Sequence, residues 1–443
     1  MPVHVFCGPT LSSTEVRAIV PAAVLHPPIR HGDALRLDAG PGDRVLIIDG
    51  VFHQSASVRH KEILALMATG ATVVGCSSMG ALRAAELDVY GMIGVGEVYR
   101  SYKQGRIDAD ADVAVTHTQG PEIEQLSVAM VDLESQLREA HRAGAIDDTE
   151  RAAITAAFRE IHYTERSSQH LAVLKAPGIA AFRAWLAKHP DRHGAKQEDA
   201  LTALRLLADE ALESPNPGAW VNQDWRTEHL AEWTDRHTGP LHNSRHISTL
   251  AQRQYRQIFD LDYPQWWRAR VLAWIAGDPS ANEDSAKRAA EASGLHLEDL
   301  TAHQRRHWLT EAEDTTLDPK EALLRILVRT TGSNPTWPGR NWPTPEPDPT
   351  TLDAVTRAYE TNDRAATLGI DINHLNPAAV RHYLHQLWHL DESTPETHTA
   401  AARDRGFPNF TTATETTNQF ILAELGPTLW THLHQRQDIG SGC

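Results

Sequence analysis

Two serines and a cysteine occupy a corner between an apolar run and a helical pattern. In ATVVGCSSMGALRAAEL, residues 71–87, the apolar run leads through Cys76, Ser77 and Ser78 into an alanine-rich segment. A serine at the start of a helix can be an N-cap, whose hydroxyl accepts a backbone N–H of the first turn. It can also be a nucleophile, because a helix N-terminus offers free N–H groups and a positive dipole end to an oxyanion. GCSSMG differs from G-x-S-x-G by one extra residue, so this pattern leaves both interpretations of Ser78 open.

A nucleophilic serine needs a base to take its proton. The chain has 25 histidines, so a histidine close in sequence says little, whereas it has only seven lysines against 35 arginines. Lys61 falls in the first turn of the helix expected after RVLIIDG, from where its amine can reach the strand end that carries Ser78. The alternative is an exposed ammonium group paired with Glu62 or Glu86.

Other residues offer different chemistry. The thiolate of Cys76 at a helix N-terminus could relay sulfur as a persulfide, although a free cysteine is more often a small buried apolar residue. His382, His385 and His389 share one helical face in HYLHQLWH, at a spacing that could bind zinc. No carboxylate or cysteine nearby completes that set, so we expect no metal and no cofactor.

The elements that must position the corner alternate between strands and helices over residues 1–120. VHVFC, RVLIIDG and ATVVGC are short apolar runs, and helical patterns follow them. This order predicts an α/β domain with a parallel sheet, right-handed crossovers and flanking helices. The stretches that end these strands, namely residues 7–9, 49–50 and 76–78, should then lie along one edge of the sheet, where function collects.

From residue 121 onward the strand signal disappears and amphipathic helical patterns dominate. A break at Glu213–Gly218 divides the chain into residues 1–212, with an α/β core over 1–120 and a helical part over 121–212, and a largely α-helical extension over 219–443. A proline-rich connector is expected at 331–351. The extension carries most of the tryptophans, which suits a peptide- or protein-binding module or additional scaffold.

Composition and local pattern exclude several classes of protein. A formal charge of -16 argues against broad nucleic-acid binding. No apolar run approaches the roughly 20 residues of a membrane-spanning helix, and the N-terminal residues lack the pattern of a signal peptide. The three cysteines show no paired spacing, so no disulfide framework is expected. We therefore expect a cytoplasmic protein without membrane contact.

Six motifs resemble, in order and spacing, those of the TfuA-like family: VFCGPTLS, IIDGVF, SVRHKEILALMATG, SSMGALRAAEL, YGMIGVGEVYRSYKQGRID and DADVAVTH. The resemblance is dense over residues 3–118 and weaker to about residue 210. It implies a role beside a YcaO enzyme, which activates peptide backbone amides with ATP, in the thioamidation of a ribosomally made peptide or protein. It also implies hydrolysis of a thiocarboxylated ThiS-type sulfur carrier to release sulfide, and help with the binding of the precursor peptide by the YcaO enzyme. The alternative is a non-catalytic adaptor or allosteric activator of that enzyme.

The resemblance also implies a Ser-Lys pair as the active site. Ser78 matches the family's serine and Lys61 its lysine, while Ser77 is the lesser candidate and Lys196, in KQEDALTALRLL, is the alternative base. Further residues of the matched motifs are expected around the pocket or in contact with partners: Asp49, His53, His60, Met79, Gly80, Arg83 and Glu86. An acidic carrier would need a basic patch, for which the candidates are Arg59, Arg83, Arg100 and Lys103.

Overall fold

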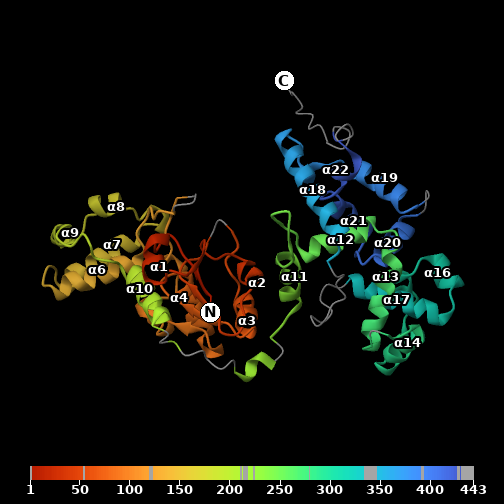
Figure 1. Cartoon of the computed structure of the whole chain (residues 1–443), viewed down its shortest axis with the longest axis horizontal. Coiled ribbons are helices and arrows are strands. Elements are labelled where there is room, and N and C mark those ends of the chain that lie inside the picture. Colours follow the sequence, from red (N-terminus) through yellow and green to blue (C-terminus); the bar gives the residue numbers. More distant parts are fainter. Residues whose placement is uncertain are drawn as a thin grey trace. The chain divides into compact units, whose positions relative to one another are not determined.

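The computed structural model describes residues 2–52, 55–118, 123–209, 212, 218–222, 225–278, 280–333, 347–390, 394–426 and 430. The chain divides into two compact units, Met1–Trp225 and Arg226–Cys443 (Figure 1). The division falls C-terminal to the expected break at Glu213–Gly218, of which residues 213–217 lie outside the described part.

A five-stranded parallel sheet forms the centre of the N-terminal unit, which confirms the α/β prediction. Its strands are, in spatial order, β2 (Val24–His26), β1 (Val3–Phe6), β3 (Arg44–Ile47), β4 (Thr72–Gly75) and β5 (Ile93–Gly94). The three central strands are the apolar runs of the sequence. The two edge strands contain three and two residues, which is too short for a periodic signal.

Residues of β3, and Ile48 directly after it, face opposite sides of the sheet in turn, as the period of a strand requires. Val45 and Ile47 belong to one core cluster, whereas Leu46 and Ile48 belong to the other. All four side chains are fully buried. The sheet is therefore covered on both faces, which explains why its strands read as continuous apolar runs.

Helices from distant parts of the sequence cover these two faces. On one side α2 (Asp33–Arg36) and α3 (His60–Ala68) pack on the sheet; on the other lie α1 (Ser13–Ile19) and α10 (Ala195–Ala208) (Figure 1). Ala200 and Leu204 of α10 share a core cluster with Leu46 and Ile48. Thus a helix more than a hundred residues C-terminal to the last strand returns to the sheet.

The order of the strands reverses between β1 and β3. From β1 the chain moves outward to β2, and then crosses back to β3, β4 and β5 on the other side. In open parallel sheets the loops at such a reversal separate and leave a crevice beyond the carboxyl ends of the strands. The residues that follow β1 and β3 border this crevice.

Two glycines bring α4 (Met79–Leu87) directly onto the sheet. A Cβ atom at Gly80 would lie 1.7 Å from the carbonyl oxygen of Ile47, and one at Gly75 would lie 2.1 Å from that of Gly80. Neither distance can hold a side chain. The glycines that flank the serine corner are therefore required by backbone packing.

The rest of the N-terminal unit is helical, as the sequence predicts from residue 121. Four helices follow one another, α6 (Met130–Arg142), α7 (Asp148–Arg159), α8 (Ser168–Val173) and α9 (Ile179–Ala187). Leu133, Phe158 and Phe182, all fully buried, form the centre of their core.

The C-terminal unit is largely helical, which confirms the prediction, with one two-stranded hairpin formed by β6 (Leu241–His242) and β7 (Arg245–His246). Its α-helices are α11 (Glu228–His237), α12 (Thr249–Phe259), α13 (Tyr263–Ala276), α14 (Glu283–Ala292), α15 (Ala302–Trp308), α16 (Glu311–Thr316), α17 (Pro319–Ser333), α18 (Pro349–Thr367), α19 (Pro377–Leu387), α20 (Pro395–Asp404), α21 (Phe410–Thr417) and α22 (Ile421–Leu425). Both ends of the expected connector at 331–351 belong to α17 and α18, and residues 334–346 lie outside the described part.

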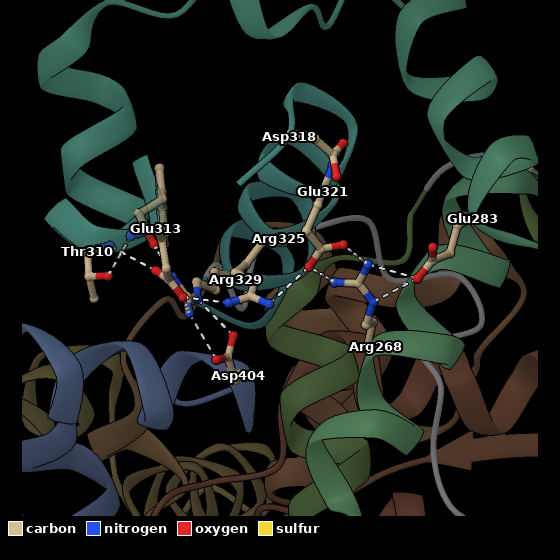
Figure 2. Close-up of polar contacts among 10 residues, drawn as sticks. Arg268, Glu283, Thr310, Glu313, Asp318, Glu321, Arg325, Arg329 and Asp404 are labelled. Carbon is tan, nitrogen blue, oxygen red and sulfur yellow. Dashed lines mark hydrogen bonds and ion pairs between the residues drawn. The ribbon is translucent and has the colours of Figure 1, made fainter. Parts of the chain in front are cut away.

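A chain of arginine–carboxylate pairs links the helices of this unit (Figure 2). Arg329 of α17 is 1% exposed and binds Glu313 of α16 and Asp404 of α20, with N–O distances of 2.7 and 2.8 Å. Arg268 of α13 pairs with Glu283 and Glu321. Because two carboxylates pair with it, the guanidinium group of Arg329 can be buried between helices.

Candidate active site

A cleft of about 290 Å³ lies at the carboxyl edge of the sheet. Its walls come from the turns after β1, β3 and β4 and from three later segments of the N-terminal unit. The lining residues are Pro9, Asp49, Gly50, Val51, Phe52, Ser78, Ala114, Val115, Thr116, His117, Tyr163, Thr164 and Lys196. Three of the residues considered from the sequence, Asp49, Ser78 and Lys196, therefore meet here.

Ser78 stands at the N-cap position of α4, yet its side chain does not cap the helix. Its φ and ψ angles are -127° and -119°, and no hydrogen bond joins its hydroxyl to the first turn within the described part of the chain. The residue is 3% exposed and lines the cleft. A hydroxyl that does not cap the helix and borders a cleft remains available for chemistry.

One backbone donor beside Ser78 remains available to an oxyanion. The N–H of Gly80 donates to the carbonyl of Ile48 at 3.3 Å. The N–H of Met79, the first residue of α4, makes no hydrogen bond among the described residues. Of these two N–H groups, that of Met79 is therefore free among the described residues.

Lys196 brings an amine to the cleft from the first turn of α10. Its side chain is 2% exposed, and Nζ donates to the carbonyl oxygen of Val113 at 3.1 Å. The same nitrogen lies 4.0 Å from Oδ1 of Asp49. Lys196 thus presents a buried amine to the cleft that Ser78 also lines.

Asp49 connects this amine to the turn after β1. Its carboxylate accepts hydrogen bonds from the backbone N–H groups of Gly8 and Thr10, at 3.1 and 2.9 Å, and from the Thr10 hydroxyl at 2.6 Å. The side chain is 2% exposed. These three donors and the nearby amine of Lys196 stabilise the carboxylate of Asp49 in its buried position.

The structure does not bring Lys61 to this cleft. Its Nζ donates to the carbonyl oxygen of Trp225 at 2.8 Å, and Lys61 is not among the described residues that line the cleft. The physical reason is that α3 covers the other face of the sheet from α10. Of the two lysines considered from the sequence, the structure places Lys196 with Ser78.

The cysteines are poorly suited to relay sulfur. Cys76 is fully buried in the core, and burial raises the pKa of its thiol well above the ordinary value. Burial, followed by the charge of Asp49, likewise raises the pKa of Cys7 to about 12. Reactive cysteines need the opposite shift, because the thiolate is the nucleophile.

His60, Arg83 and Glu86 form a polar group that joins α3 to α4. Oε2 of Glu86 lies 2.8 Å from His60 Nε2 and 2.7 Å from the Arg83 guanidinium. Burial opposes the charge of Glu86, but hydrogen bonds from His60 and Arg83 lower its pKa. These residues do not line the cleft as described, so their visible role is to connect two helices. His53 lies outside the described residues.

The expected basic patch is only partly available. Arg83 is buried and donates to the carbonyl of Val58 as well as to Glu86. Lys103 is bound to Asp88 at 2.6 Å. Arg59 and Arg100 are exposed.

Sequence reasoning missed several residues around the cleft. Thr116 and His117 line the cleft and belong to DADVAVTH, a motif in which the sequence predicts no individual site residue. Tyr163 and Thr164 also line it, but nothing in their local sequence indicates a site. Asp132 of α6 accepts the backbone N–H of Lys196 at 2.9 Å, a contact that only tertiary structure can show.

In the part of the chain that the structure describes, no group of three or more His, Cys, Asp or Glu residues is arranged to hold a metal ion. His385, one member of the histidine face, instead packs against His398 with ring centroids 4.2 Å apart.

No described helix combines the length and apolar character needed to cross a membrane.

Comparison with known proteins gives one family. Residues 49–167 match the TfuA-like protein family, and no curated protein matches the chain. The match includes Asp49, Ser78 and His117, but begins later than the resemblance seen from residue 3 and ends before Lys196. Residues 49–167 of the N-terminal unit are therefore similar to the TfuA-like protein family, and this similarity supports, in general terms, a role beside a YcaO enzyme.

Proposed function

We propose that this protein hydrolyses the thiocarboxylated C-terminus of a ThiS-type sulfur carrier, with Ser78 as nucleophile and Lys196 as base. The sulfide that is released would serve a YcaO enzyme in the thioamidation of a ribosomally made peptide or protein, and the chain would also help that enzyme bind its substrate. The observation that carries the proposal is that one cleft contains a serine hydroxyl that does not cap its helix and a buried lysine amine. The family match supports the association with a YcaO enzyme.

The reaction is an acyl transfer in two steps. Lys196, in the fraction of molecules in which its amine is uncharged, takes the proton of the Ser78 hydroxyl, and the oxygen attacks the thiocarboxylate carbon. The carbon–sulfur bond breaks, and sulfur leaves as hydrosulfide with the proton from Lys196. Water then attacks the acyl-serine ester, giving its proton to Lys196, and Ser78 leaves with a proton returned by the amine. The products are a carrier carboxylate, hydrosulfide and one proton.

The corner supplies a donor for the negative charge that develops on the carbonyl oxygen. The N–H of Met79 lies directly after Ser78 at the positive end of α4 and is free among the described residues. An oxyanion bound there would be stabilised by a preorganised dipole.

The shape of the cleft suits an extended chain end. A second hollow of about 200 Å³ shares Phe52, Ala114 and Tyr163 with the cleft of Ser78. It is also lined by the exposed residues Ser55 and Asp110. Together the two hollows lead from exposed residues to buried Ser78, and we place the tail of the carrier along this path.

The test is incubation with thiocarboxylated carrier, measuring free sulfide and the carrier mass for wild type and Ser78→Ala. We expect wild type to release sulfide and convert the carrier to its carboxylate, and Ser78→Ala to lose this activity by about a thousandfold or more. Ser12→Ala, which removes the exposed N-cap hydroxyl of α1, is the matched control and should remain active. Full sulfide release by Ser78→Ala would refute the proposal.

A non-catalytic adaptor is the second candidate, favoured because the Gly80 N–H donates to the carbonyl of Ile48 and is not free to bind an oxyanion. In that case thioamidation by the YcaO enzyme would need the chain but not its Ser78 hydroxyl. Measuring thioamidation with free sulfide supplied, in the presence of wild type, Ser78→Ala or no added chain, separates the two functions.

A further inference from the structure

We infer that Ser77 and Asp132 are positioning residues, which hold the main chain of Lys196 and thereby place its amine in the cleft that Ser78 lines. Their importance for catalysis rests on the proposed function, but their contacts with Lys196 do not. Neither residue takes part in the chemical steps derived above.

Ser77 holds the carbonyl side of Lys196. Its hydroxyl donates to the Lys196 carbonyl oxygen at 2.7 Å, and the residue is fully buried. The backbone of Ser77 has φ = 66°, in the left-handed region that non-glycine residues rarely adopt. A serine in this conformation turns its hydroxyl toward α10 while its neighbour, Ser78, borders the cleft.

Asp132 holds the amide side of the same residue. Its Oδ1 accepts the Lys196 backbone N–H at 2.9 Å. The fit is close, because a Cβ atom at Gly194 would lie 2.4 Å from that oxygen. Burial raises the pKa of Asp132, while the positive charge of Lys196 and its backbone N–H act in the opposite direction.

These contacts restrain Lys196 at both ends. Its backbone is bound through its N–H and its carbonyl, and its Nζ is bound by Val113 and faces Asp49. The restraining groups come from the corner before α4, from α6 and from the turns of the cleft. Since a displacement of about 1 Å between reacting groups can cost about a hundredfold in rate, such restraint matters for an acid–base residue.

The experiment uses the full chain with two substitutions at each position. Ser77→Gly and Ser77→Ala both remove the hydroxyl, but glycine also relieves the strained φ angle. Asp132→Ala removes the acceptor for the Lys196 N–H, whereas Asp132→Asn keeps an acceptor oxygen and removes the charge. Ser12→Ala and Asp148→Asn, at the exposed starts of α1 and α7, are the controls.

Two assays are used. Sulfide release gives kcat and KM, and peptide mass mapping follows the rate at which an amine-acylating reagent labels Lys196. We expect Ser77→Gly, Ser77→Ala and Asp132→Ala to lower kcat about tenfold or more, with little change in KM. Asp132→Asn should retain more activity than Asp132→Ala, because its amide oxygen can still accept the Lys196 N–H. Lys196 should be labelled faster in all three variants that lose a hydrogen bond.

Unchanged labelling of Lys196 in these variants would overturn the inference, as would losses of activity equal to those of the two controls. If wild type releases no sulfide, the proposed function fails, and the labelling rates still decide whether Ser77 and Asp132 hold Lys196.

Discussion

The amine nitrogen of Lys196 lies 4.0 Å from Oδ1 of Asp49, and each side chain is only 2% exposed. Asp49 follows β3 and Lys196 lies in the first turn of α10, so this pair connects the sheet edge to a helix far along the chain. Removal of either partner would leave the other buried without its counter-charge.

This pair predicts a strong energetic coupling. Asp49→Asn and Lys196→Met should each lower the free energy of unfolding by about 3 kcal/mol, because each removes an opposite charge that faces a buried group. The double variant should lose less than the sum, since neither charge then remains. Urea unfolding of the four proteins measures the coupling, and strictly additive losses would show that the two groups do not interact.

The two lysines should differ sharply in sulfide release. Lys196→Met is expected to reduce it by about a hundredfold or more, the usual contribution of a general base. Lys61→Met removes a hydrogen bond to the Trp225 carbonyl and should cost about 1 kcal/mol of stability while sulfide release continues. A loss of activity confined to Lys61→Met would return the role of base to Lys61.

Gly80 should be intolerant of even one methyl group. Gly80→Ala would place a Cβ atom 1.7 Å from the Ile47 carbonyl oxygen, so α4 would have to move away from the sheet. We expect a loss of roughly 2 kcal/mol or more, together with reduced activity because Ser78 moves with the helix. Gly40→Ala is the matched control, since nothing lies within 4 Å of its added Cβ; thermal unfolding of both variants would reveal equal effects if the contact were unimportant.

Asp199 should make stability fall as pH rises. It accepts the N–H groups of Glu97 and Val98 at the start of α5 (Gly96–Lys103), and burial raises its pKa from 3.8 to about 6. A folded-state pKa above the unfolded value means that its contribution is complete below about pH 4 and is lost as pH rises through about 6. Relative to Asp199→Asn, wild type should lose up to about 3 kcal/mol over this range. Urea unfolding of both proteins at several pH values tests this, and parallel pH curves would contradict it.

Glu313, in the C-terminal unit, should make stability fall as pH falls. Burial opposes its charge, but hydrogen bonds from Arg329 and from the Thr310 N–H lower its pKa from 4.5 to about 2. Its contribution is therefore present above about pH 4.5 and lost as pH falls toward 2. Wild type should lose up to about 3 kcal/mol more than Glu313→Gln on acidification. Circular dichroism during acid titration of both proteins is the measurement; coincident acid transitions would remove Glu313 as the cause.

Local pattern was sufficient for the central strands and for the helical character of the C-terminal unit. The runs ending at Cys7, Asp49 and Cys76 are apolar because both faces of the sheet are covered. Pattern was insufficient for β2 and β5, whose three and two residues carry no period. Local pattern also could not show that Arg83 and Glu86 pair with each other rather than with a partner protein, because the spacing of charged residues does not reveal which of them are buried.

The sequence by itself determined the serine corner, since a strand, a tight turn between glycines and a helix are all encoded within residues 71–87. Tertiary structure decided which amine meets it. Lys61 is near in sequence but lies on a helix packed against the other face of the sheet, whereas Lys196 arrives because Ala200 and Leu204 bury α10 against Leu46 and Ile48. Such packing depends on the complementary fit of apolar surfaces that are distant in the chain, so the local spacing of residues cannot predict it.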